Sequence, residues 1–247
     1  MAPNDDVVLE GAVAITAALE ASSRPMHRLL IDSRVRFERD AARLRKLAGA
    51  AGVPVEVADE ARIAELAQGK THGGMIALAG ERRTVSLDEL VAGRAAPFIA
   101  MLDGIEDPYN FGQAVRSLYA AGADGLVLRP RNWMSAAGVV ARASAGATER
   151  MPTAIAETVE EAAEHYRAHG LRVVVAAKER AVPLYDADLT GGLFMVIGGE
   201  KRGVTRSFAD SADLRLSIPY GRSYGQSLGT VAATSAIAFE VLRQRRG

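Results

Sequence analysis

Apolar and polar positions alternate along the C-terminal part of the chain as they do in layered α/β domains. Short runs of apolar residues, which fit strands buried on both faces, are separated by longer segments with apolar residues at helical spacing. This pattern predicts strands at 98–102, 125–128, 153–155, 171–176, 193–197 and 214–218, and helices at 111–121, 134–145, 159–169 and 230–245. Such alternation predicts a mostly parallel sheet that is covered on both faces.

The N-terminal part shows a smaller version of the same alternation. Helices are expected at 8–21, 36–51 and 59–68, and strands at 27–32, 53–57 and 71–79. A polar stretch with a short helix at 87–91 follows. We therefore expect a small α/β domain at 1–80, a linker at 81–96 and a larger α/β domain at 97–247.

Two of the buried strands run directly into glycine-rich loops. The strand at 193–197 is followed by Gly-Gly-Glu-Lys-Arg-Gly at 198–203, and the strand at 214–218 by Pro219 and a polar loop at 220–226. Ligands bind outside the carboxyl ends of strands in open α/β sheets. Both loops are therefore expected to line one binding site.

Composition narrows the classes of function. With 30 Lys+Arg and 30 Asp+Glu residues the net charge is zero, so any nucleic acid must bind through local patches. The absence of cysteine excludes disulfides, thiolate zinc sites and a cysteine nucleophile. The four histidines, His27, His72, His165 and His169, are scattered along the sequence, and no metal site is expected. No apolar run approaches the ~20 residues of a membrane span, and the acidic N-terminus does not fit a signal peptide, so a cytoplasmic location is expected.

A basic segment lies between Arg24 and Lys46, with eight Lys or Arg residues against three acids. It is either a solvated face or a surface that contacts the phosphates of a nucleic acid. The candidate contacts are Arg24, Arg28, Arg34, Arg36 and Arg39.

Known local motifs do not explain the glycine loops. The loop at 198–203 has the wrong glycine spacing for dinucleotide binding, and no phosphate-binding Gly-Lys-Ser/Thr is present. Residues 225–229 match the hydrolase pattern Gly-x-Ser-x-Gly by letters, with Ser227 at its centre. However, Pro219 and a glycine-broken loop separate Ser227 from the preceding strand, which disfavours a serine hydrolase.

Three segments indicate a protein family only when they are considered together and in their order along the chain. They are Asn110-Phe111-Gly112 followed by Arg116, then Ile197 to Gly203, then Ile218-Pro219 with Ser227-Leu228 and the alanine-rich helix to Glu240. Alone, Asn110 is a plausible helix cap and Arg116 an exposed salt-bridge partner. In combination they resemble the signature of the SpoU (TrmH-like) RNA ribose 2′-O-methyltransferases of the SPOUT superfamily. The segments 143–147 and 71–74 also resemble family segments.

The resemblance implies a small N-terminal L30e-like RNA-binding domain and a C-terminal SPOUT domain, with a trefoil knot and a mostly parallel sheet. It also implies a homodimer that binds S-adenosylmethionine in the knotted loops and methylates a ribose 2′-hydroxyl. Ribosomal RNA is the preferred substrate because of the N-terminal domain, and transfer RNA is the alternative. By position, the catalytic set is Asn110, Arg116, Glu200 and Ser227. The cofactor pocket is formed by Gly198, Gly199, Ile218, Leu228 and Gly229.

One departure from the family pattern motivates a rival function. The family usually has asparagine after Ser-Leu, where this chain has Gly229, so a non-catalytic RNA-binding protein that retains the fold is the rival. Because a guanidinium is effectively never deprotonated in proteins, Arg116 is expected to bind the substrate phosphate and hydroxyl as a forked donor. Glu200 is expected to order the motif loops. The proton would then leave through the phosphate, water or another residue.

Overall fold

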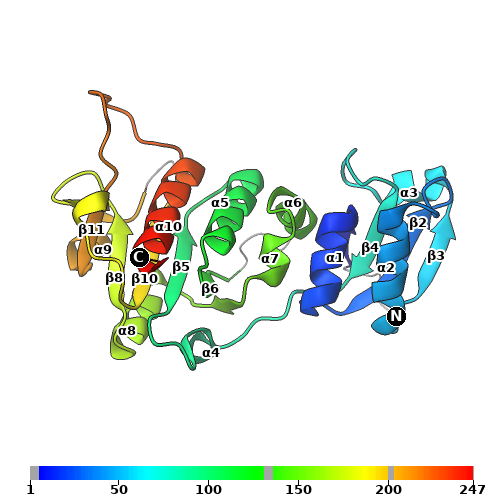
Figure 1. The fold of residues 1–247 in the computed structure, drawn as a ribbon, viewed down its shortest axis with the longest axis horizontal. Helices are drawn as coiled ribbons and strands as arrows, with labels where there is room; N and C mark the ends of the chain where they lie inside the picture. The colour runs from blue at the N-terminus through cyan, green and yellow to red at the C-terminus, as the bar shows by residue number, and fades with distance from the viewer. Residues whose placement is uncertain (1–5, 131–135, 200–202, 247) are drawn as a thin grey trace. The chain divides into compact units, whose positions relative to one another are not determined.

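The computed structural model describes residues 6–130, 136–199 and 203–246, which form two compact units (Figure 1). The first unit comprises 6–83 together with 136–150, and the second comprises 84–130 and 151–246. The segment 136–150 therefore packs with the N-terminal unit, which differs from the continuous range 97–247 predicted for the larger domain. The predicted domain boundaries remain a prediction.

The N-terminal unit contains a four-stranded sheet in the order β1-β4-β2-β3. β1 and β2 run antiparallel to β4, whereas β2 and β3 are parallel. The strands are β1 (Val7–Glu10), β2 (Met26–Asp32), β3 (Val55–Ala58) and β4 (Met75–Ala79), and the helices are α1 (Ala12–Ala21), α2 (Arg39–Ala50) and α3 (Glu60–Leu66). The prediction of a helix from residue 8 was wrong, because Val7 to Glu10 pair with β4 and Gly11, at a φ of 82°, separates strand from helix.

The segment 136–150 forms two short helices, α6 (Ala137–Ala143) and α7 (Ala147–Arg150), instead of the single helix predicted at 134–145. They are separated at Ala145 and Gly146, which have φ values of 50° and 78°. Ala141 is buried in the same apolar cluster as Leu9 of β1 and Ile15 of α1. Burial of this helix face therefore joins the segment to the N-terminal unit.

The second unit contains a seven-stranded sheet in the order β7-β6-β5-β10-β8-β11-β9, and every pair of neighbours is parallel. The six predicted strands and the parallel sheet are confirmed. β9 was not predicted, because it is a two-residue edge strand that contains proline. The strands are β5 (Phe98–Asp103), β6 (Gly125–Leu128), β7 (Thr153–Ile155), β8 (Arg172–Ala176), β9 (Val182–Pro183), β10 (Leu193–Gly198) and β11 (Leu214–Ser217).

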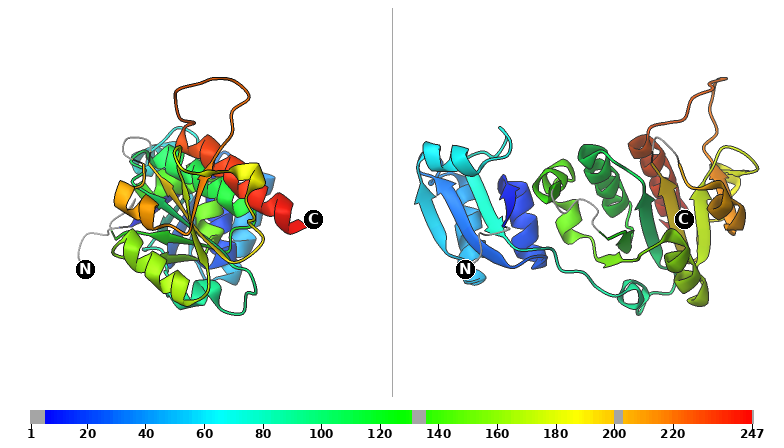
Figure 2. Two further views of the ribbon diagram at one scale, coloured as in Figure 1. Left: turned by 90° about the vertical axis from the view of Figure 1, so that its left-hand side faces the viewer. Right: turned by 180° about the vertical axis from the view of Figure 1, so that it is seen from behind.

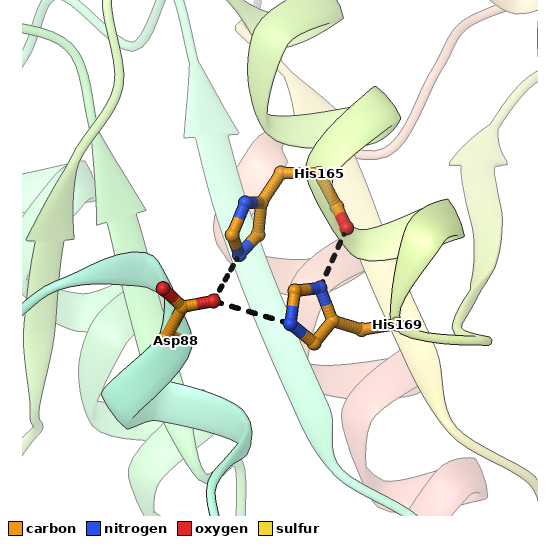
Figure 3. A group of neighbouring side chains, drawn as sticks. All are labelled: Asp88, His165 and His169. Atoms are coloured by element: carbon orange, nitrogen blue, oxygen red, sulfur yellow. Dashed lines mark hydrogen bonds and ion pairs between the residues drawn. The ribbon is translucent and has the colours of Figure 1, made fainter.

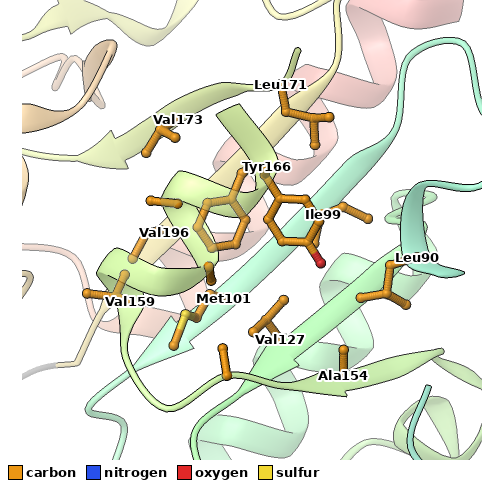
Figure 4. Close-up of a cluster of buried hydrophobic side chains, with 14 of the residues drawn as sticks. Leu90, Ile99, Met101, Val127, Ala154, Val159, Tyr166, Leu171, Val173 and Val196 are labelled. Carbon is orange, nitrogen blue, oxygen red and sulfur yellow. The ribbon is translucent and has the colours of Figure 1, made fainter. Parts of the chain in front are cut away.

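Helices cover both faces of this sheet (Figure 2). On one face α4, α8 and α9 enclose an apolar cluster in which Tyr166 of α8 packs against Phe194 of β10, with ring centroids 4.9 Å apart (Figure 4). On the other face α5 and α10 pack against each other, and Ser117 and Ser235 share a hydrogen bond of 2.7 Å. These helices are α4 (Leu87–Val91), α5 (Pro108–Ala120), α8 (Val159–Ala168), α9 (Arg206–Ser211) and α10 (Thr230–Arg246); a 3-10 turn, η2 (Leu184–Asp186), follows β9. Among the helices of the described residues, each is too short or too polar to cross a membrane.

Candidate functional site

An open cleft of about 900 Å³ lies at the carboxyl ends of β10, β8 and β11, which are neighbours in the sheet. Residues of three loops line it: 176–180 after β8, 197–199 and 203–206 after β10, and 217–229 before α10. The two glycine-rich loops that the sequence predicted to share a site therefore do line one cleft. Its volume is in the range of ordinary small-molecule sites.

The backbone of the loop after β10 packs closely against other backbone, and at two positions of this loop only glycine fits. A Cβ atom on Gly199 would lie 2.0 Å from the carbonyl oxygen of Gly104, in the loop between β5 and α5. A Cβ atom on Gly198 would lie 2.2 Å from the carbonyl carbon of Gly203. The Gly199 amide donates a hydrogen bond of 2.7 Å to the carbonyl of Asp103. The Gly203 amide donates one of 2.9 Å to the carbonyl of Gly199. The missing side chains thus let this loop pack backbone against backbone at the cleft wall.

The loop before α10 projects beyond the end of the sheet (Figure 1), and two hydrogen bonds hold it, one within the loop and one to the loop after β8. The Leu228 amide donates a hydrogen bond of 3.0 Å to the Tyr220 hydroxyl. The Lys178 ammonium donates a 3.2 Å bond to the carbonyl of Gly225. Residues 219–229 of this loop are exposed, so they are available to a large substrate at the cleft mouth.

The chemistry of the cleft wall is mixed. Ile197, Ile218 and Leu228 provide apolar surface, while Lys178 and Arg206 provide positive charge. This combination fits S-adenosylmethionine, which carries an apolar base face and a carboxylate, and it also fits the phosphates of RNA.

The structure gathers most, but not all, of the predicted site residues. All five predicted cofactor residues line the cleft: Gly198, Gly199, Ile218, Leu228 and Gly229. Ser227 lines it as well. Glu200 lies outside the described residues.

The other two predicted catalytic residues lie on α5, outside the described lining of the cleft. Asn110 is half-buried in the first turn and Arg116 is exposed. Asn110 is not the helix cap that the sequence suggested. Instead, the Asp107 carboxylate caps the helix and accepts a hydrogen bond of 2.7 Å from the backbone amide of Asn110. Pro108 occupies the first helical position, where its lack of an amide hydrogen costs nothing.

The basic segment of the N-terminal unit is partly an exposed surface. Arg28, Arg34 and Arg39 are exposed, and Arg36 is half-buried. The guanidinium of Arg34 holds the pKa of the buried Asp32 carboxyl below its usual value. Arg28 pairs with Glu56 at 3.1 Å.

Arg24 departs from this prediction because it is buried. Its guanidinium forms a two-pronged pair with Glu149 at 2.9 and 3.1 Å, so it is not exposed to RNA. The Ser23 hydroxyl donates to the same carboxylate at 2.5 Å. Burial lowers the pKa of Arg82 to about 10, and the charge of Arg24 acts in the same direction.

Phe37 is a surface residue that the sequence pattern did not single out. Its ring is 84% exposed beside α2, and the Arg36 guanidinium lies over it at 4.6 Å from the centroid. Exposed aromatic rings among arginines are typical of surfaces that stack unpaired RNA bases. The signal for this surface in the sequence was a single phenylalanine among the arginines of Arg-Val-Arg-Phe-Glu-Arg at 34–39.

A parallel sheet with a glycine-rich cleft at the carboxyl ends of its strands, together with a second unit that exposes arginines, fits an enzyme that acts on nucleic acid with a small cosubstrate. The chain belongs to the SpoU rRNA Methylase family, whose sequence profile matches residues 97–239. A second profile, described as RNA 2'-O ribose methyltransferase substrate binding, matches residues 8–85. It is therefore an S-adenosylmethionine-dependent RNA 2′-O-methyltransferase, as the resemblance implied.

Individual relatives agree with the family assignment. The chain is 33% identical to the 23S rRNA (guanosine-2'-O-)-methyltransferase RlmB of Shewanella oneidensis, over 81% of this chain and 82% of the relative. It is 31% identical to the enzyme of the same name from Ralstonia nicotianae, over 96% of each chain. In fold it is similar to the SpoU methyltransferase AviRb from Streptomyces viridochromogenes in complex with AdoMet. That comparison has a TM-score of 0.80 at 23% identity and covers 98% of this chain and 91% of AviRb. The predicted fold class, a small L30e-like domain plus a SPOUT domain, is confirmed.

Proposed function

We propose that this protein methylates the ribose 2′-hydroxyl of a guanosine in 23S ribosomal RNA, in the cytoplasm. The observation that carries the proposal is the cleft, where Gly198 and Gly199 of the loop after β10 meet Ile218, Leu228 and Gly229 of the loop before α10. The named 23S rRNA methyltransferases with 31–33% identity extend over both units of the chain, which supports ribosomal RNA as the substrate.

The transfer is an in-line displacement, so the alignment of the reacting atoms supplies much of the rate. The ribose oxygen forms a bond to the methyl carbon as the carbon–sulfur bond breaks, and the hydroxyl proton leaves to a phosphate, water or another residue. Arg116 holds the RNA phosphate and hydroxyl through two N–H donors, since guanidinium does not act as a base. Ser227 lines the cleft, and we assign it a contact with the RNA near the reacting hydroxyl.

A homodimer through α5 and α10 explains how Arg116 reaches a cleft that it does not line. Tyr119 on α5 is 41% exposed, and Phe239 on the adjoining α10 is 47% exposed. Arg116 precedes Tyr119 by three residues and therefore lies on the same side of α5. Two copies that bury these aromatic rings would carry Arg116 of each copy to the interface. A Phe239→Asp variant should shift the mass measured by light scattering from dimer to monomer and lower activity.

The N-terminal unit positions the RNA through Arg34, Arg36 and Arg39, with Phe37 stacking on an unpaired base. Replacing the three arginines with glutamine should weaken RNA binding and flatten its dependence on salt concentration. Replacing Phe37 with leucine should weaken binding with little change in salt slope, because stacking releases few counterions. If the salt dependence of RNA affinity is unchanged in the arginine variant, these arginines form an ordinary solvated face and do not contact RNA.

The decisive experiment is methylation of 23S rRNA fragments and of transfer RNA with labelled S-adenosylmethionine, followed by mass spectrometry of the nucleosides. A 2′-O-methylguanosine product from 23S rRNA alone supports the proposal, whereas methylation of transfer RNA alone supports the alternative substrate. Calorimetry with S-adenosylmethionine tests the non-catalytic rival, which predicts no donor binding. Arg116→Lys should lose most turnover, and Arg167→Lys on α8, where Arg167 pairs with Asp213, is the matched control.

A further inference from the structure

Three side chains that could bind a metal ion meet on the face of the large sheet covered by α4 and α8 (Figure 3). Asp88 lies in the first turn of α4, His165 lies on α8, and His169 follows the last turn of α8. One carboxylate oxygen, Asp88 Oδ1, lies 3.3 Å from His165 Nε2 and 3.1 Å from His169 Nε2. None of the three lines the methyltransferase cleft. Two imidazole rings therefore share a single anionic oxygen.

The ring of His169 also makes a hydrogen bond on its far side, and this bond determines where the hydrogen of the neutral ring lies. His169 Nδ1 lies 2.9 Å from the carbonyl oxygen of His165, and because a carbonyl only accepts, Nδ1 carries the hydrogen. In the neutral ring, Nε2 then directs its lone pair at a negatively charged oxygen. A proton or a metal ion between the two atoms relieves this repulsion, and Nδ1–H bonded to a backbone carbonyl is the usual outer partner of a metal-bound histidine.

His165 presents a second ring nitrogen to the same point. Its Nε2 atom is shielded from solvent and makes no hydrogen bond within the part of the chain that the structure describes. Such a shielded nitrogen needs a partner, and the nearby carboxylate oxygen at 3.3 Å is outside the geometry of a good hydrogen bond. A metal ion would satisfy both histidines and the carboxylate at once.

The two distances from Asp88 to the histidines fit a tetrahedral ion. Ligand atoms bound at 2.0–2.1 Å to a tetrahedral Zn²⁺ lie roughly 3.3 Å from each other, and the two measured separations are 3.1 and 3.3 Å. The three candidate ligand atoms all lie within 4.8 Å of one another. Two imidazole nitrogens and one carboxylate oxygen suit Zn²⁺, Co²⁺ or Ni²⁺ better than Mg²⁺ or Ca²⁺. Asp88 and His169 are exposed, so water can complete the coordination.

Both helices that carry the ligands are held in place by other interactions. α4 begins with a reciprocal cap between Ser86 and Glu89, and Leu90 on α4 is buried. Tyr166, the residue after His165, is fully buried in the same apolar cluster as Leu90 (Figure 4). The ligands are therefore positioned before an ion arrives, which favours binding.

We propose that Asp88, His165 and His169 form a binding site for a divalent transition-metal ion, with Zn²⁺ as the best fit, and that the ion ties α4 to the end of α8. The site goes beyond the proposed methyltransferase function. It also revises the expectation of no metal site, which rested on the scatter of histidines along the sequence. The spacing of His165 and His169, four residues apart on a predicted helix, was the signal available.

The test uses the full chain without a histidine tag, treated with chelator and dialysed into metal-free buffer. Calorimetry with ZnCl₂ should give one ion per chain, and CoCl₂ should produce the visible absorption of tetrahedral cobalt. At a Zn²⁺ concentration 100-fold above Kd, the unfolding temperature should rise by roughly 5–10 °C. MgCl₂ should give neither heat of binding nor stabilisation.

Asp88→Asn and His169→Gln should abolish the cobalt absorption and the stabilisation, while leaving the unfolding temperature of the metal-free protein nearly unchanged. His27→Gln is the matched control, because His27 also faces a carboxylate, Asp6, at 2.7 Å, but as a two-residue pair. It should bind Zn²⁺ like the wild type. Absence of Zn²⁺ and Co²⁺ binding to the wild type, or binding that survives both site variants, would overturn the proposal.

Discussion

Replacing Gly199 with alanine tests whether contact between two loops shapes the cofactor site. The added Cβ atom would lie 2.0 Å from the carbonyl oxygen of Gly104 and 2.5 Å from its carbonyl carbon. Both atoms are backbone, so no flexible side chain can move aside. Since carbon–oxygen contacts begin near ~3.3 Å, the two loops must separate by about 1 Å or more. The 2.7 Å hydrogen bond from the Gly199 amide to Asp103 would be strained by the same movement.

The free-energy cost of Gly199→Ala follows from the cost of forcing extra atoms into a packed site. Such insertions typically cost about 1–3 kcal/mol. If the loop can bind S-adenosylmethionine only in its original position, the affinity falls roughly 5- to 150-fold, because about 1.4 kcal/mol corresponds to a factor of ten. If the loop is free to relax, the cost appears instead in the unfolding free energy.

Calorimetry with S-adenosylmethionine and denaturant unfolding measure the two effects separately. Gly191→Ala is the matched control, since a Cβ atom at Gly191 meets nothing within 4 Å and this residue lies outside the cleft. The control should bind the cofactor like the wild type. A Gly199→Ala protein with wild-type cofactor affinity and wild-type stability would refute the reasoning about the loop contact.

Three further substitutions test packing and charge in the N-terminal unit. Glu149→Gln leaves the buried Arg24 without its counter-charge and should lower the unfolding free energy by about 3–5 kcal/mol; unchanged denaturant unfolding would contradict the buried pair. Gly49→Ala, in α2 with open space around the new Cβ, should raise stability by about 0.5–1 kcal/mol, and a loss would show a hidden clash. Arg34 lowers the pKa of Asp32 below 3.8, so the stability from this pair is present above that pH and is lost as the pH falls through the lowered pKa. Asp32→Asn should remove this part of the acid dependence in melting curves taken between about pH 2 and 6, and identical slopes would argue against the pair.

The cleft was predictable from the sequence because its signals are local. A buried apolar run identifies a strand such as β10, and glycines after the run identify the loop at its carboxyl end. The pairing order of the sheet was not predictable by these rules, because it places β10 between β5 and β8 although neither precedes it directly in the chain.

Features that depend on distant partners were missed for one physical reason: side-chain burial is set by tertiary contacts. Arg24 looked like a surface cation because its partner Glu149 lies far along the chain. Asp88 lies in the segment predicted as a linker, yet it faces His165 on α8 and His169 just after it. Val7 to Glu10 resembled the start of a helix until pairing with β4 made them a strand. Sequence spacing reports the faces of single elements, not which elements meet.

The late position of β10 in the chain has a consequence for synthesis on the ribosome. β10 pairs with β5 through Leu193 and Phe98, so the centre of the sheet stays open until translation has passed β10. At ordinary elongation rates, the interval between the end of β5 and the end of β10 lasts roughly 5–20 s. Throughout that time the nascent chain exposes an unpaired apolar edge of the kind that aggregates with other chains. Soluble yield should therefore depend more on chaperone capacity during translation than on the stability of the finished protein.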